Sequence, residues 1–287
     1  MGRIISLFSA FVAFTLFSGA GAEPRRVALV IGNAAYKHAP ELANPRNDAA
    51  AMAAALKALD FEVLDGADLD KQAIDRIVRD FSVKLSGAEA GVFFYAGHGL
   101  QVGGVNYLMP IDAELSTAAA LDWEMVRLDL IQRTMEREVA TNVLFLDACR
   151  DNPLARNLAL AMGTRSGDIG RGLAAADAGV GTLISFSTQP GNVALDGSGR
   201  NSPYADALVR HLATEGEDLS AMLIDVRLDV MASTARKQVP WEHSALTGRF
   251  YFNPTSETPS LGPKVKPVPT RPSTQDCFTF NNKTFCD

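Results

Sequence analysis

Two residues of this chain, His98 and Cys149, have the types and surroundings needed for nucleophilic chemistry. Each follows a short apolar run, within Ala96-Gly97-His98-Gly99 and Asp147-Ala148-Cys149-Arg150. A cysteine thiolate is a strong nucleophile, and an adjacent imidazole lowers the pKa of the thiol and later protonates a leaving amine. If the two residues lie side by side, the pair is sufficient for acyl transfer.

Both residues also have ordinary structural interpretations. A single cysteine after a strand is commonly a small buried hydrophobic residue, and a histidine between glycines can be a turn residue that bonds the local backbone. The other histidines, His38, His211 and His243, lack comparable surroundings and are expected on surfaces or helices. No HxxxH pattern or cluster of carboxylates accompanies them, so no metal site is predicted.

The pattern from Arg25 to Phe252 indicates the elements that would hold this pair. Short apolar runs alternate with amphipathic stretches, which predicts an α/β fold with a mainly parallel sheet. Strands are expected at 27–31, 61–64, 91–95, 142–146, 182–186 and 249–252. Helices are expected from the capping pair Asn44-Pro45 onward and near 74–85, 128–138, 202–214 and 218–233.

The predicted strands place both reactive residues at one edge of the sheet. His98 and Cys149 follow the carboxyl ends of their strands, where α/β sheets place their sites. If the strands are neighbours about 4.8 Å apart, the two side chains approach contact distance. Glycines on both sides of His98 let the backbone turn sharply, and the backbone N–H groups of Gly99 and Cys149 are the expected oxyanion donors.

These motifs resemble those of the caspase, metacaspase and bacterial orthocaspase superfamily. Tyr95-Ala96-Gly97-His98-Gly99 is similar to its histidine motif, and the run from Asp147 to Pro153 is similar to its cysteine motif. The separation of His98 and Cys149, 51 residues, agrees with that of caspases. The resemblance extends from Arg26–Asn33 through Gln189–Gly191 and Asn201–Pro203 to Gly248–Phe252.

The resemblance implies both a fold and an activity. The fold would be a caspase-like α/β/α sandwich with a mainly parallel six-stranded sheet, forming a p20-type catalytic domain of clan CD. The activity would be that of a cysteine endopeptidase acting on peptides or proteins, with no required cofactor. Calcium activates some metacaspases, but the sequence offers no convincing set of carboxylates for it.

The resemblance also suggests which residue precedes the cleaved bond. In metacaspase-like enzymes, acidic side chains line the pocket for that residue (S1) and accept Arg or Lys. By motif position these acids are Asp48 and Asp147. Asp48 could instead be a first-turn acid that complements the helix dipole, and Asp147 a structural acceptor for loop amides. True caspases place arginines in this pocket to hold aspartate, and Arg46 lies near the corresponding loop.

The N-terminal residues have the pattern of a signal peptide. Arg3 precedes an apolar run from Ile4 to Phe17, and Ala20-Gly21-Ala22 fits a cleavage signature. The run is short for a membrane span. We therefore expect removal of residues 1–22, export to the periplasm or the extracellular space, and no span in the mature chain. The alternative is an uncleaved anchor that holds the same domain outside the membrane.

The predicted peptidase domain, 23–253, is followed by a proline-rich linker at 254–275 and a hairpin at 276–287. Cys277 and Cys286 bracket alternating aromatic and polar residues around Asn281-Asn282, which predicts cross-strand neighbours that oxidising surroundings would join. Cys149 is then the free thiol. Within the domain, the Gly- and Arg-rich segment 151–179 is expected to be either a self-processing site or a mobile loop.

Composition and motifs argue against the other functions. A formal net charge of −6 gives no electrostatic reason to expect a nucleic-acid partner. A nucleotide binder would need a Gly-rich phosphate loop, and a thiol oxidoreductase would need a CxxC motif. The main alternative is a caspase-like scaffold in the cell envelope that binds without cleaving. Because His98 and Cys149 are both present, we predict a peptidase that cleaves after Arg or Lys.

Overall fold

The computed structural model describes residues 25–255, with gaps at 118, 150–153, 155–157, 159–168, 171–172, 190–193 and 198, and residues 277–280 and 283–286. For Cys149, 169–170 and the last two strands it describes the backbone alone. The predicted signal peptide, nearly all of the linker and most of the segment 151–179 lie outside the described residues.

A central sheet of six strands has the order β2-β1-β3-β6-β8-β9. The first five strands are parallel and β9 is antiparallel. Their bounds are β1 (Arg26–Gly32), β2 (Phe61–Ala67), β3 (Ala90–Val102), β6 (Thr141–Cys149), β8 (Thr182–Phe186) and β9 (Trp241–Ser244). Three short strands, β4 (Val105–Leu108), β5 (Val126–Arg127) and β7 (Ile169–Gly170), adjoin the end of β3 or one another. The predicted mainly parallel sheet is confirmed.

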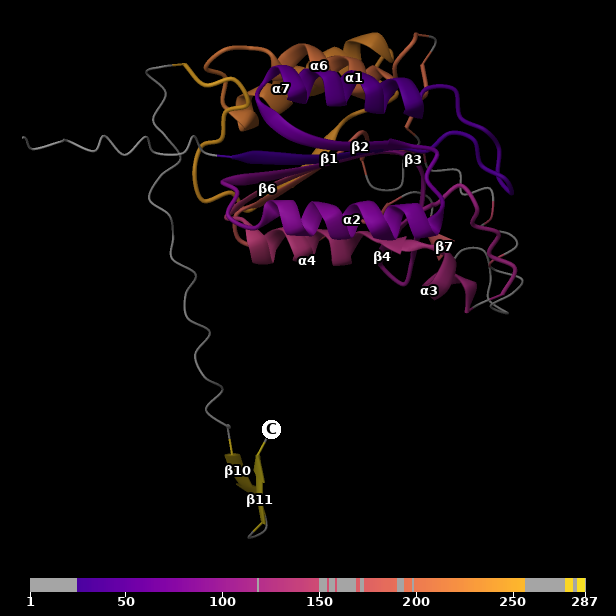
Figure 1. The fold of residues 1–287 in the computed structure, drawn as a ribbon, viewed down its shortest axis with the longest axis vertical. Coiled ribbons are helices and arrows are strands. Elements are labelled where there is room, and N and C mark those ends of the chain that lie inside the picture. Colours follow the sequence, from indigo (N-terminus) through magenta and orange to yellow (C-terminus); the bar gives the residue numbers. More distant parts are fainter. Residues whose placement is uncertain are drawn as a thin grey trace, which may run out of the picture.

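Helices cover both faces of this sheet (Figure 1). On one face lie α1 (Pro45–Ala58), α6 (Pro203–Leu212) and α7 (Leu219–Ser233), and on the other lie α2 (Lys71–Leu85) and α4 (Leu128–Glu138), with the short α3 (Ala120–Glu124) near the sheet edge. Strand β3 alternates between the two cores. Val92 and Phe94 pack beneath α1, α6 and α7, whereas Phe93 and Tyr95 pack beneath α2 and α4. Both faces are covered, which explains the continuous apolar run.

Polar side chains begin three of the helices. Asp70 accepts a hydrogen bond from Ala73 N at the start of α2, and Ser202 and Asp218 cap α6 and α7 in the same way. Asn44 occupies the corresponding position before α1 but makes no capping bond. Its amide instead donates to the carbonyl of Asp196, so a tertiary contact replaces the expected cap.

The sixth strand lies elsewhere than the sequence indicated. We expected it at 249–252, but the edge strand is β9, and Tyr251 forms only an isolated bridge with Asp218. Phe250 and Phe252 are buried in the core beneath α1, α6 and α7 rather than in a strand of the sheet. A polar edge strand has no alternation of apolar residues that would predict it. Two core phenylalanines at i and i+2 have the alternation that is typical of a strand.

A second, two-stranded sheet joins β10 (Cys277–Phe280) and β11 (Lys283–Cys286) in antiparallel register, with Cys277 opposite Cys286. The disulfide between them stays a prediction. Of the helices in the described part of the chain, none has both the length and the apolar character to cross a bilayer.

Candidate active site

Parallel pairing of β3 with β6 places His98 directly opposite Cys149. Both strands are longer than the apolar runs that predicted them. Beyond His98, β3 continues to Val102 because its last residues pair with β4 and β7. The two residues therefore lie on the strands themselves and not one residue beyond them, and neighbouring strands bring their backbones to within about 5 Å.

The imidazole of His98 is oriented by a backbone carbonyl. Its Nε2 lies 2.9 Å from the oxygen of Pro40, and because a carbonyl can only accept, Nε2 of the neutral ring carries the proton. Nδ1 is then an acceptor, and it is buried without a hydrogen-bond partner among the described residues. Burial lowers the pKa of His98, and the Pro40 carbonyl opposes this shift. The ring is thus a neutral base with one nitrogen available.

The two predicted S1 acids meet at the start of α6. Asp48, 2% exposed, accepts hydrogen bonds through Oδ1 from Asn201 Nδ2 at 3.0 Å and from the backbone N–H of Ser202 at 2.9 Å. The Ser202 hydroxyl donates to Asp147, which is 7% exposed. Asp48 is therefore a first-turn acid of α1 whose carboxylate is buried and hydrogen-bonded, and Asp147 accepts from a side chain.

Both carboxyls hold protons more tightly than usual. Burial and then the charge of Asp147 raise the pKa of Asp48 to about 7, and burial raises the pKa of Asp147 to about 6. The hydrogen bonds from Ser202 act in the opposite direction on both. Two buried acids side by side cannot easily ionise together, and a cation placed between them would remove that difficulty.

Asp196 is a third acid at this site that the sequence analysis missed. Its charge raises the pKa of Asp48, of Asp147 and of His98. Asn44 holds its backbone through the carbonyl bond described above. A loop residue has no periodic pattern, so the only sequence signal was its position between the motifs at 189–191 and 201–203.

Arg46, the residue that could have marked a preference for aspartate, forms an ion pair with Asp68. Asp68 also accepts from the backbone N–H groups of Ala34 and Ala35, each at 2.9 Å. The Arg46 guanidinium therefore has a partner outside the cluster of Asp48, Asp147 and Asp196.

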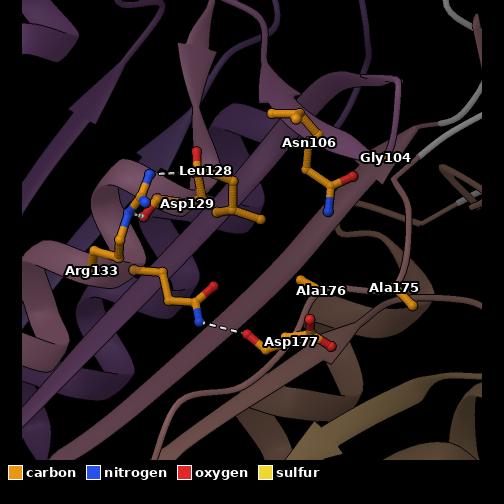
Figure 2. Close-up of a pocket in the computed structure, with 10 residues that line it drawn as sticks. Gly104, Asn106, Leu128, Asp129, Arg133, Ala175, Ala176 and Asp177 are labelled. Carbon is orange, nitrogen blue, oxygen red and sulfur yellow. Dashed lines mark hydrogen bonds and ion pairs between the residues drawn. The ribbon is translucent and has the colours of Figure 1, made fainter. Parts of the chain in front are cut away.

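A cavity of about 330 Å³ lies between β4, α4 and residues 175–177 (Figure 2). The side chain of Gln132 donates across it to the carbonyl of Asp177 at 2.7 Å. The residues that line it include neither member of the His98/Cys149 pair and none of the three acids.

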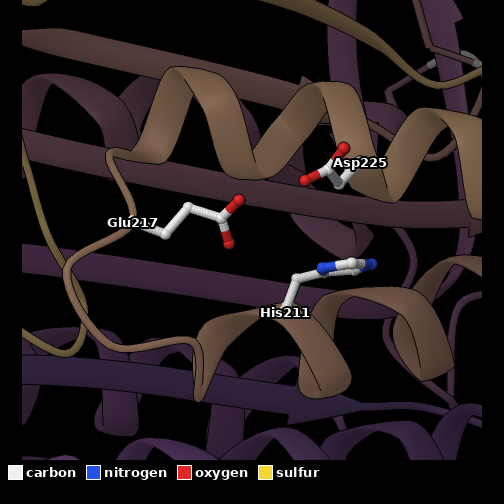
Figure 3. A group of neighbouring side chains, drawn as sticks. All are labelled: His211, Glu217 and Asp225. Atoms are coloured by element: carbon white, nitrogen blue, oxygen red, sulfur yellow. The ribbon is translucent and has the colours of Figure 1, made fainter.

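One group among the described residues has side chains placed to hold a metal ion: His211, Glu217 and Asp225, whose ligand atoms lie within 4.8 Å of one another (Figure 3). These residues come from α6, the following loop and α7. His211 Nε2 already lies 2.8 Å from Asp229, which also pairs with Arg210. His211 lies in the last turn of α6, in agreement with the predicted surface or helix position.

Comparison with known proteins agrees with this architecture. Caspase-1 from Spodoptera frugiperda superposes with a TM-score of 0.58 at 20% identity, over 82% of this chain and 92% of that one. The chain therefore has a caspase-like α/β fold, with a mostly parallel sheet flanked by helices. The family profile described as the caspase domain matches residues 25–251, and the chain belongs to this family of cysteine peptidases.

Two curated relatives match a shorter part of the chain. Mucosa-associated lymphoid tissue lymphoma translocation protein 1 of Homo sapiens and its Mus musculus homolog are each 32% identical over 125 residues. That match covers 44% of this chain and 15% of each relative. The chain thus corresponds to a small part of their length.

Proposed function

We propose that the protein is a cysteine endopeptidase that hydrolyses peptide bonds after Arg or Lys through a Cys149/His98 dyad. The observation that carries the proposal is the strand register that sets His98 opposite Cys149. Membership of the caspase family supports peptide hydrolysis by a cysteine nucleophile.

In the proposed mechanism, the Cys149 thiol gives its proton to Nδ1 of His98, while Nε2–H remains bonded to Pro40. The thiolate attacks the carbonyl carbon, and the N–H groups of Gly99 and Cys149 stabilise the oxyanion. The imidazolium then protonates the leaving amine, which leaves a thioester on Cys149. Water, deprotonated by His98, hydrolyses the thioester. No cofactor takes part.

The preference for a basic residue is supported by the buried acids. A guanidinium or ammonium group entering beside Asp48 and Asp147 would favour their ionised forms and supply the missing countercharge. An aspartate side chain would add a third or fourth negative charge to the same region. The pairing of Arg46 with Asp68 leaves that arginine engaged elsewhere.

The test is hydrolysis of a fluorogenic peptide panel ending in Arg, Lys or Asp, with and without calcium. We expect cleavage after Arg and Lys, no need for calcium, and a loss of at least about a thousandfold in Cys149→Ala and His98→Ala. His243→Ala, which changes a histidine on the edge strand β9, should leave the rate unchanged. Full activity in Cys149→Ala would refute the mechanism.

Other results would change the specificity or the class of the protein. Faster cleavage after Asp than after Arg would overturn the pocket assignment but not the dyad. A folded protein that cleaves nothing in the panel, and whose Cys149 does not react with an electrophilic peptide, would favour the cell-envelope scaffold.

We further propose that the mature chain is exported and that Cys277 pairs with Cys286. The opposite positions of these residues in the β10–β11 register support the pairing. Thiol titration of the exported, denatured protein should then find one reactive thiol rather than three, and its N-terminal sequence should begin near Glu23.

A further inference from the structure

Both backbone polar groups of His98 are held by tyrosine hydroxyls. The His98 N–H donates to Tyr36 Oη at 2.7 Å, and Tyr95 Oη donates to the His98 carbonyl at 2.7 Å. The two hydroxyl oxygens are 3.4 Å apart. Since Tyr36 Oη accepts from His98, its own proton can go to Tyr95 Oη. The contacts of the two hydroxyls thus connect the N–H of His98 with its carbonyl, which also accepts from Met109 N at 3.0 Å.

Gly97 leaves room for this hydroxyl pair. A Cβ atom at residue 97 would lie 2.5 Å from Tyr36 Oη and 2.7 Å from Tyr95 Oη, and the backbone there has φ +153°. Any side chain at this position would therefore displace both hydroxyls. Gly97 is therefore needed both for the contacts of the two tyrosine hydroxyls and for the backbone conformation.

The ring of Tyr36 also lies against the imidazole. The ring centroids are 4.5 Å apart and the planes are inclined by 46°. His98 is buried, and burial disfavours its protonated form. The face of a tyrosine ring carries partial negative charge and attracts cations. The Tyr36 ring therefore favours the imidazolium that would form when His98 accepts the thiol proton.

Tyr36 and Pro40, which both contact His98, belong to the loop that follows β1. That loop is fixed by hydrogen bonds from Tyr36 N to Ala34 O at 3.0 Å and from Lys37 N to Ile111 O at 2.8 Å. One loop therefore supplies the ring beneath the imidazole, the acceptor for the His98 N–H and the carbonyl at Nε2.

We propose that Tyr36 is a positioning residue for His98: its hydroxyl fixes the histidine backbone and its ring stabilises the imidazolium. The inference rests on the proposed dyad and adds to it a residue that no catalytic motif contains. It predicts that the two parts of the tyrosine side chain have separable effects.

The test compares Tyr36→Phe, which keeps the ring, with Tyr36→Leu, which removes it, in the full chain. The pH dependence of Cys149 alkylation by iodoacetamide, followed by mass spectrometry of the Cys149 peptide, reports the thiolate. We expect Tyr36→Leu to move its midpoint upward by about half a pH unit, because a less stable imidazolium supports less thiolate. Tyr36→Phe should restore the wild-type midpoint yet lower kcat about tenfold at unchanged KM.

Tyr204→Phe is the matched control, because Tyr204 is also buried and its hydroxyl donates to Ser185 at 2.7 Å without contacting His98. It should change neither the midpoint nor kcat. A wild-type midpoint in Tyr36→Leu together with unchanged kcat in Tyr36→Phe would overturn the proposal.

One further variant, Tyr95→Phe, keeps the test decisive. If Tyr36→Leu fails to fold, Tyr36→Phe and Tyr95→Phe decide the positioning part, and unchanged kcat in both overturns it. Alkylation needs no peptide cleavage, so the midpoint comparison holds even if Cys149→Ala proves fully active and the proposed peptidase mechanism fails.

Discussion

Asp48 is almost fully buried and accepts hydrogen bonds from Asn201 and Ser202 through Oδ1. Asparagine at this position could accept the same two bonds through its own carbonyl oxygen. The substitution Asp48→Asn would therefore remove the charge and keep the contacts. This makes residue 48 a place where binding and stability can be measured separately.

We predict that Asp48→Asn raises stability at pH 8 and lowers cleavage after Arg. Because the folded-state pKa, about 7, is above the usual value of 3.8, the folded protein binds the proton more tightly, and wild-type stability falls as pH rises from about 4 to about 7. The variant lacks this loss. Denaturant unfolding should show a gain of about 1–3 kcal/mol at pH 8 and little at pH 4, while kcat/KM falls at least tenfold.

Asp75→Asn is a suitable control, because Asp75 is an exposed acid paired with Lys71 on α2. Removal of the Asp75 charge should change the free energy of unfolding by less than about 0.5 kcal/mol and leave the cleavage rate unchanged. If Asp48→Asn were instead less stable than the wild type at pH 8, the ionised Asp48 carboxylate would not destabilise the folded protein as its raised pKa implies.

The residues of the site differ in how visible they are in the sequence. His98, Cys149 and Asp147 follow apolar runs that mark strands, so their place in the sheet could be predicted. Asp196 and Tyr36 come from loops whose path depends on tertiary contacts, and no local pattern indicates that they approach the histidine. The carbonyl of Pro40 belongs to the backbone and carries no sequence signal at all.

At the scale of elements, the start of α6 connects a helix cap with the acids. The Ser202 hydroxyl accepts from Ala205 N at 3.0 Å and donates to Asp147, and its N–H donates to Asp48. The helix dipole places partial positive charge at this end. Helix α6 thus stabilises the ionised forms of both acids.

We predict that Ser202→Ala and Asp70→Ala cost similar stability but affect binding differently. Each removes a side-chain cap, of α6 and of α2 respectively, and should lower the free energy of unfolding by about 1 kcal/mol. Of the two, only Ser202→Ala also removes a hydrogen bond that lowers the pKa of Asp147, which Ser187 lowers as well. Its KM for Arg substrates should rise several-fold at pH 6, whereas Asp70→Ala keeps the wild-type KM. Equal KM values for Ser202→Ala and Asp70→Ala would show that the Ser202 hydroxyl caps the helix without influencing the acids.

Elements with a strong hydrophobic periodicity could be predicted, whereas strands that exist only through pairing with a neighbouring strand could not. Ile74, Phe81 and Leu85 mark α2 because they recur on one buried face. Strands β5 and β7 have two residues each and exist through their pairing with β4 and β3. The edge strand β9 is polar, and its place follows only from pairing with β8.

For the whole molecule, the alternation of strands and helices predicted the layered, mainly parallel sheet, whereas the order of its strands comes from the structure. Each parallel pair needs a crossover, so helices must cover both faces. The predicted position of the sixth strand was wrong because the chain leaves this regular alternation after α7. There, burial of Phe250 and Phe252 satisfies the apolar residues without a strand.

The parallel pairing of β6 with β8, from Asn142↔Thr182 to Leu146↔Phe186, has a consequence for a chain cut between them. The N-terminal piece would contribute β1 to β6, and the C-terminal piece would contribute β8, β9, α6 and α7. Residues from both pieces share the core that includes Phe94, Phe145 and Leu208. The two pieces of the cut chain would therefore stay together as a tight heterodimer, held by backbone hydrogen bonds and apolar contacts.

We predict that limited tryptic cleavage at the arginines of 150–171 gives two bands after denaturation but one native-sized particle on gel filtration. Dissociation of the native particle into two fragments would show that chain continuity is needed. A particle that keeps its native size would mean that the peptide link between β6 and β8 is dispensable once folding is complete. A single hydrolytic event there could then change the surroundings of the site without unfolding the protein.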